Sequence, residues 1–133
     1  MKKYIVTGLI SAALISCGTA NTLLSTANQP SLNETHWQLA DNVKGKIPTL
    51  NVQEGRITGT GGCNNYFGEL ATEPGTGTFA ATKIGSTKMA CEAMETETSF
   101  FNMLSKVNKY RVSGNTLELY QNGLLLLKFN RMQ

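Results

Sequence analysis

The sequence predicts an α+β domain: a curved antiparallel β-sheet, arranged as a hairpin-rich meander, with one amphipathic helix. Three observations predict it. Short stretches alternate apolar and polar residues with the period of two that is typical of strands, and glycine-containing turns separate these stretches. One stretch, between Cys91 and Val107, instead spaces its apolar residues as a helix does.

The first expected strands are short. Residues 36–39 place Trp37 and Leu39 on one face. Residues 49–53 alternate in the same way, and Glu54-Gly55 turns that strand back into residues 56–58. The strands over 49–53 and 56–58 are expected to form a hairpin.

Glycines interrupt the middle of the chain, and a clear turn follows them. Gly59, Gly61 and Gly62 come just before Cys63. Residues 73–77 form a turn by composition and lead into an expected strand over 79–84.

The helix is expected between Cys91 and Val107. Its apolar face is predicted from Met94, Phe101, Leu104 and Val107. Acidic residues near the start (Glu92, Glu95, Glu97) and Lys106 near the end suit the helix dipole, and we expect the glutamates to be solvated.

The C-terminal part gives the clearest strand pattern. Strands are expected over 110–113, 117–120 and 124–129, the last one strongly apolar with Lys128 toward solvent. Asn122-Gly123 lies between the last two, and this pair favours the positive φ angles of a tight hairpin turn.

The N-terminus has the features of a secretory signal over residues 1–16. Lys2 and Lys3 precede an apolar run that is too short to span a bilayer. Cys17 follows Ser16, with Leu14 three residues upstream, and this resembles the lipobox of bacterial lipoproteins. The resemblance implies cleavage before Cys17 and its lipidation. The alternative is an ordinary cleaved signal that ends near a cysteine.

The resemblance also implies a location and a domain plan. The lipid would hold the mature chain to a membrane of the cell envelope. Gly18 stands where a retention aspartate would be, which in a Gram-negative cell resembles sorting to the outer membrane, facing the periplasm. Residues 17–34 are rich in Thr, Ser, Asn and Ala and predict a flexible tether, and residues 35–133 predict one domain.

Charge argues against nucleic acid as a partner. The chain has twelve basic and nine acidic residues, but Lys2 and Lys3 leave with the signal, so ten face nine in the mature part. No cluster of Lys and Arg remains to follow a phosphate backbone.

Four segments carry a family resemblance. They are residues 37–39 (Trp-Gln-Leu), residues 59–64 (Gly-Thr-Gly-Gly-Cys-Asn), residues 86–91 (Ser-Thr-Lys-Met-Ala-Cys) and the closing strands over 117–119 and 125–129. Together they resemble the META domain, typified by HslJ-type heat-shock lipoproteins of bacterial envelopes. The resemblance implies a small domain of antiparallel sheet and one helix. It also implies a loose link to envelope stress, with no catalytic residues to carry over.

Cys63 and Cys91 remain once Cys17 is lipidated. In an oxidising compartment an even pair predicts a disulfide. Two alternatives stay open: buried free thiols, or a nucleophilic cysteine assisted by His36, the only histidine. These three residues contain no closely spaced pair of ligands, so no metal site is expected, and no cofactor motif is present in the sequence.

A polar patch is the remaining candidate for binding. If the cysteines are bridged, Asn64 and Asn65 come close to Thr87 and Lys88. Such groups are suited to a small polar ligand or an envelope protein. The alternative is that Asn64 and Thr87 satisfy backbone groups in irregular connections.

The sequence leaves three functional hypotheses open. The first is a non-enzymatic, membrane-anchored envelope lipoprotein with a stress-related binding or accessory role. The second is a structural or assembly partner of a larger envelope complex. The third is a redox protein that works through Cys63 or Cys91, which requires a reactive thiol of lowered pKa.

Overall fold

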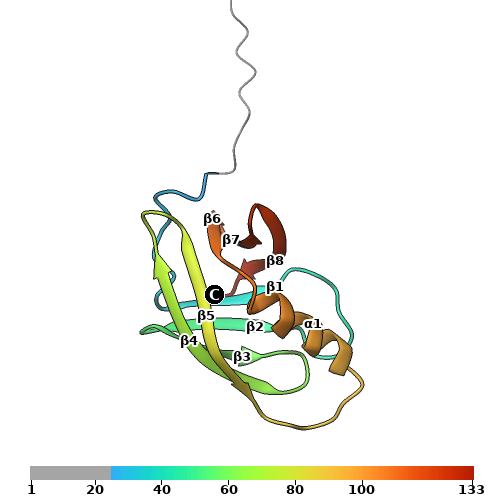
Figure 1. Ribbon diagram of the computed structural model, residues 1–133. Coiled ribbons are helices and arrows are strands. Elements are labelled where there is room, and N and C mark those ends of the chain that lie inside the picture. The colour runs from blue at the N-terminus through green and yellow to red at the C-terminus, as the bar shows by residue number, and fades with distance from the viewer. Residues whose placement is uncertain (1–24) are drawn as a thin grey trace, which may run out of the picture.

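A computed structural model describes residues 25–133 and shows a closed antiparallel barrel of eight strands with one helix (Figure 1). The elements in chain order are β1 (Thr35–Leu39), β2 (Thr49–Gln53), β3 (Arg56–Thr60), β4 (Asn65–Glu73), β5 (Thr78–Ser86), α1 (Met94–Leu104), β6 (Lys109–Ser113), β7 (Thr116–Gln121) and β8 (Leu124–Arg131). Each strand pairs with its neighbour in sequence, so the order is that of a meander.

The expected α+β fold with a curved antiparallel sheet is wrong, because the first and last strands pair and close the sheet into a barrel. Trp37 of β1 lies opposite Arg131 of β8, and Leu39 lies opposite Phe129. Eight strands enclose an interior just wide enough to be filled by side chains. Local alternation and turn residues indicate which neighbouring strands pair, but they carry no information on this pairing across the whole domain.

The expected hairpin turns lie where the sequence places them. Glu54 and Gly55 connect β2 to β3, and Asn122 and Gly123 connect β7 to β8. All four have positive φ angles, as the two central residues of a type I′ hairpin turn require.

The contact between β5 and β6, which we call the seam, contains few strand pairs, and α1 lies between these two strands in the sequence. Only Thr78 and Lys109 pair in register, with flanking hydrogen bonds from Phe79 N to Asn108 O and from Tyr110 N to Gly77 O. The helix packs its buried Phe100 against the core, with ring centroids 5.7 Å from Tyr66 and 6.4 Å from Phe129.

The core is a single cluster of apolar side chains inside the barrel. Its largest fully buried members are Trp37, Tyr110, Phe79, Phe100 and Phe129, with Leu and Ile side chains between them. The Trp37 indole N–H donates to Thr35 Oγ1 at 2.7 Å, which satisfies the one polar group of this buried ring.

Residues before Thr35 also pack against the barrel. Leu32 is only 1% exposed and belongs to the core. Tyr110 donates its hydroxyl hydrogen bond to Pro30 O at 2.9 Å, and Gln29 Oε1 accepts one from Val112 N at 2.7 Å. This part of the expected tether is therefore bound to the barrel. The expected signal over 1–16 and the expected lipidation at Cys17 lie outside the described residues. Among residues 25–133, no helix is long and apolar enough to cross a bilayer.

Candidate binding cleft and the carboxylate network beside it

A buried carboxylate, that of Glu97, ties α1 to the connection between β3 and β4. Glu97 is 4% exposed. Its Oε2 accepts hydrogen bonds from the backbone N–H of Cys63 at 3.0 Å and of Asn64 at 2.5 Å, and its Oε1 accepts one from Asn64 Nδ2 at 2.7 Å. Two successive N–H groups that point at one carboxylate form an anion-binding concavity, filled here by the protein itself.

Two glycines precede the N–H groups that bind this carboxylate, and the first lies against Glu97 itself. A Cβ at Gly61 would lie 2.7 Å from the Phe101 ring and 2.9 Å from Glu97 Cγ, so helix and loop touch directly at this residue. Gly62 has a φ of +118°, a conformation that other residues rarely adopt, and it comes just before the two N–H groups.

Asn64 uses every hydrogen-bonding group of its side chain within the protein. Besides Glu97, its Nδ2 donates to Met89 O at 3.0 Å. Its Oδ1 accepts from Thr87 Oγ1 at 2.8 Å and from Met89 N at 2.7 Å. An amide has two donor hydrogens and two acceptor lone pairs, so none remains for a ligand.

The other residues of the expected polar patch lie around this network. Thr87 and Lys88 are exposed and, with Asn64, line a hollow of about 260 Å³. Asn65 begins β4 and is exposed, and its backbone oxygen accepts a hydrogen bond from Thr87 N at 3.1 Å. The structure thus brings the patch together and gives Asn64 the internal role that we considered as the alternative.

The structure joins Cys63 to Cys91 in a disulfide, with their Cα atoms 6.0 Å apart. The bridge connects the β3–β4 loop to the segment just before α1. His36 does not approach either cysteine as a base: its Nδ1 is hydrogen-bonded to Asn51 Oδ1 at 3.0 Å, on the adjacent strand. Among residues 25–133, no three His, Cys, Asp or Glu side chains gather as a metal site.

The hydrogen bonds at Glu97 control its titration. Burial alone would raise the pKa of Glu97, but the hydrogen bonds from Asn64 and Cys63, together with the positive charge of Lys88, hold this pKa below its ordinary value. The folded protein therefore favours the ionised form.

This lowered pKa predicts acid sensitivity. Glu97 contributes stability fully above the ordinary glutamate pKa of about 4.3, and this contribution is lost as the pH falls through the lower pKa of the folded state. We expect Glu97→Gln to lower the free energy of unfolding near neutral pH and to flatten its fall in acid. Urea unfolding across this range measures both. Glu95→Gln, at an exposed position of the same helix, should lower the free energy of unfolding near neutral pH by less than Glu97→Gln does.

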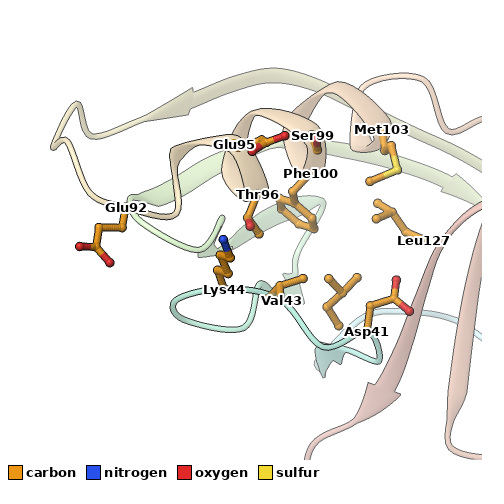
Figure 2. Close-up of a pocket in the computed structure, with 11 residues that line it drawn as sticks. Asp41, Val43, Lys44, Glu92, Glu95, Thr96, Ser99, Phe100, Met103 and Leu127 are labelled. Atoms are coloured by element: carbon orange, nitrogen blue, oxygen red, sulfur yellow. The ribbon is translucent and has the colours of Figure 1, made fainter.

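A cleft lies on the other side of α1, between the helix and the β1–β2 loop over residues 40–48. Figure 2 shows Phe100 and Met103 pointing from the helix toward the loop, and Val43, Lys44 and Asp41 projecting from the loop on the opposite side. Leu39 and Leu127 complete its apolar floor, and the volume is about 340 Å³.

Charge at the edge of this cleft is mainly negative. Asp41, Glu92 and Glu95 supply three carboxylates, and Lys44 supplies one ammonium group. Figure 2 shows the Asp41 carboxylate facing the side of Met103 and Leu127, whereas Glu92 points away from the cleft. An apolar floor beside an anionic edge is complementary to a molecule that has an apolar body and a positive group.

Sequence reasoning missed Glu97, Phe100 and the cleft loop. Glu97 was expected to be solvated, yet it stands three and seven residues before Phe100 and Leu104, which is the spacing of one helix face. That spacing is the signal that marks Glu97 as buried. Met94, expected on the apolar face, is 40% exposed.

Comparison with known proteins gives a family and a fold. The family model of the META domain matches residues 30–133. No curated protein matches the chain. A protein from Burkholderia xenovorans, solved by NMR, has a TM-score of 0.66 at 19% identity, covering 100% of this chain and 99% of its own. A DUF4847 family protein from Bacteroides vulgatus has a TM-score of 0.55 at 14% identity, covering 74% and 93%. At these identities the two structures support the fold alone.

Proposed function

The chain belongs to the META domain family, and on that premise we propose that it is a lipid-anchored protein of the cell envelope that binds small amphipathic cations in the cleft beside α1. The cleft carries the proposal. Its volume of about 340 Å³ lies within the roughly 300–1,000 Å³ range of small-molecule sites, and its apolar floor is bordered by charged and hydroxyl side chains. Holding such cations would serve the stress-related role that the family resemblance implies.

The anchor is proposed from residues that precede the barrel. Leu14, Ser16 and Cys17 match the lipobox pattern, and more than one acyl chain on Cys17 gives stable attachment where a single chain binds reversibly. With Gly18 after the cysteine, a Gram-negative cell would place the barrel at the outer membrane, facing the periplasm.

Binding without catalysis is part of the proposal. Nucleophilic chemistry needs a reactive side chain next to a base. Cys63 and Cys91 are joined to each other, and His36 is engaged with Asn51. The charged groups at the cleft are suited to holding a ligand by its charge.

The test uses the barrel with Cys17→Ser and dodecyltrimethylammonium as the probe, below the concentration at which the probe forms micelles. Isothermal titration calorimetry should detect binding, and dodecyl maltoside, a neutral amphiphile with the same chain, should bind less well. We expect Asp41→Asn to weaken the binding of the cation by roughly 1.4-fold to fivefold, because an exposed charge pair contributes about 0.2–1 kcal/mol.

Glu54→Gln is the matched control, because Glu54 is an exposed carboxylate on the β2–β3 turn and does not line the cleft. It should bind as the wild type does. Equal binding of the two amphiphiles, or equal losses in the two variants, would reject the cleft as a site for cations.

A further inference from the structure

The tip of the β7–β8 hairpin exposes apolar side chains that the sequence pattern assigns to a buried strand. Leu124 is 64% exposed and Leu125 is 43% exposed, whereas Leu127 on the same strand is 2% exposed. The register shifts between Leu119 and Tyr120, where their partners are Leu127 and Leu125. The strand therefore leaves the core before it reaches the turn.

This tip lies beside the place where the N-terminal segment reaches the barrel. Thr26 and Gly123 line one hollow of about 210 Å³, together with Lys109 and Tyr120. Thr26 Oγ1 and Lys109 Nζ both donate to Thr76 O, at 3.3 Å and 2.9 Å. Figure 1 shows the segment from residue 25 entering at the same end of the molecule as β6 and the β7–β8 hairpin.

The distance along the chain limits how far this end can be from a lipid anchor. Residues 18–25 separate Cys17 from Thr26. At no more than about 3.6 Å per residue, Thr26 lies within roughly 30 Å of a lipidated Cys17 in any conformation. This step rests on the lipidation in the proposed function. It keeps the surface around Thr26, and with it the hairpin tip, within reach of the bilayer.

Basic residues accompany the exposed leucines. Lys109 directly follows Asn108, and Lys106 lies two residues before it. Asn108 is tied to the hairpin tip because its Nδ2 donates to Asn122 Oδ1 at 2.7 Å. Two acidic residues lie in this region, and both are engaged: Glu73 Oε1 accepts a hydrogen bond from Gly75 N in the β4–β5 turn, and Glu118 accepts one from Tyr120 and pairs with Arg111. Two ammonium groups beside two exposed leucines match an anionic lipid surface.

We propose that the β7–β8 hairpin tip is a second, non-covalent contact with the membrane. Leu124 and Leu125 enter the interfacial region of the bilayer, and Lys106 and Lys109 face anionic headgroups. The contact fixes the orientation of the barrel, which the lipid anchor by itself leaves free. Met89 and the disulfide then face away from the bilayer.

The test places a fluorescent side chain at the tip of the full lipidated protein. Leu124→Trp is reconstituted in vesicles of phosphatidylethanolamine and phosphatidylglycerol, with and without lipid brominated near the headgroup end of its acyl chains. The native Trp37 is fully buried, so the wild type supplies the background emission. We expect bromine to quench roughly half of the added emission, since indole rings settle at the level of the headgroups.

Met89→Trp is the matched control. Met89 is 62% exposed, close to the value for Leu124, but it lies beside Asn64 and Glu97 rather than near Thr26. Its emission should not respond to bromine. Equal quenching of both variants, or none in either while the protein stays on the vesicles, would overturn the hairpin contact alone.

Two further outcomes separate the hypotheses. Flotation of the vesicles before the fluorescence measurement tests the anchor, and a wild type that does not float would overturn the proposed lipidation and the hairpin contact together. A Leu124→Trp emission that follows protein concentration and ignores bromine would assign the tip to a second copy of the chain, and would overturn the membrane contact.

Discussion

Asn64→Ala is expected to lower the free energy of unfolding by about 3–5 kcal/mol, the loss typical of breaking a buried charged network by removing one partner. The variant removes four side-chain hydrogen bonds at once. It leaves Glu97 as a buried carboxylate with fewer donors, and it leaves the N–H of Met89 without its acceptor. Such unsatisfied groups cost more than the lost bonds alone.

Urea unfolding at neutral pH measures this loss, with Asn65→Ala as the control. Asn65 is the next residue and has the same side chain, but it is exposed, so its replacement should change the free energy of unfolding by about 0.5 kcal/mol or less. Similar losses in the two variants would show that the network around Glu97 does not stabilise the barrel.

The second large effect is expected from the disulfide. Replacing Cys63 and Cys91 together by alanine should cost about 3–4 kcal/mol in the chain-entropy model. The bridge closes a loop between residues 28 apart in sequence, and without it the unfolded chain regains the freedom of that loop. The loop contains β4, β5 and the connection that leads to α1.

Denaturant unfolding of the domain, with and without a reductant, checks this expectation. When the wild-type barrel is reduced, its free energy of unfolding should fall most of the way to that of the double alanine variant. The double alanine variant itself should not respond to the reductant. A reduced wild type as stable as the oxidised one would contradict it. The disulfide and Asn64 fix the same loop. A variant that lacks both should therefore lose less stability than the sum of the two separate losses.

The local elements of this fold can be predicted from the sequence. The turns at Glu54-Gly55 and Asn122-Gly123 depend on residues that tolerate positive φ, and such residues are visible in the sequence. Strand alternation and the spacing between Cys91 and Val107 likewise depend only on neighbours within a few residues. For this reason the expected strands, the hairpins and the single helix are found close to their places, whereas β4 (Asn65–Glu73) was not expected as a strand.

The long-range features cannot be predicted in this way. The pairing of Trp37 with Arg131, which closes the barrel, joins the two ends of the domain and has no local marker. The exposure of Leu124 depends on a register shift against β7, which the apolar run conceals. The cleft needs a loop and a helix that are distant in sequence.

The candidate site was predicted in part. The pairing of Cys63 with Cys91 and the closeness of Asn64 to Thr87 follow from a simple argument on an oxidising compartment and convergent segments. The role of Asn64 depends on Glu97, whose burial is visible only from its position on the apolar face of the helix.

The seam between β5 and β6 indicates where this barrel would open when it unfolds in part. A single pair in register, Thr78 with Lys109, leaves most of β5 without a ladder partner on that side. If α1 loses its attachment through Glu97, both strands present open edges, and open edges recruit strands from other chains. The half that contains α1 to β8 can then complete the β1–β5 half of a second molecule. Domain-swapped dimers are therefore the expected product of partial unfolding, with the connection between β5 and α1 as the hinge.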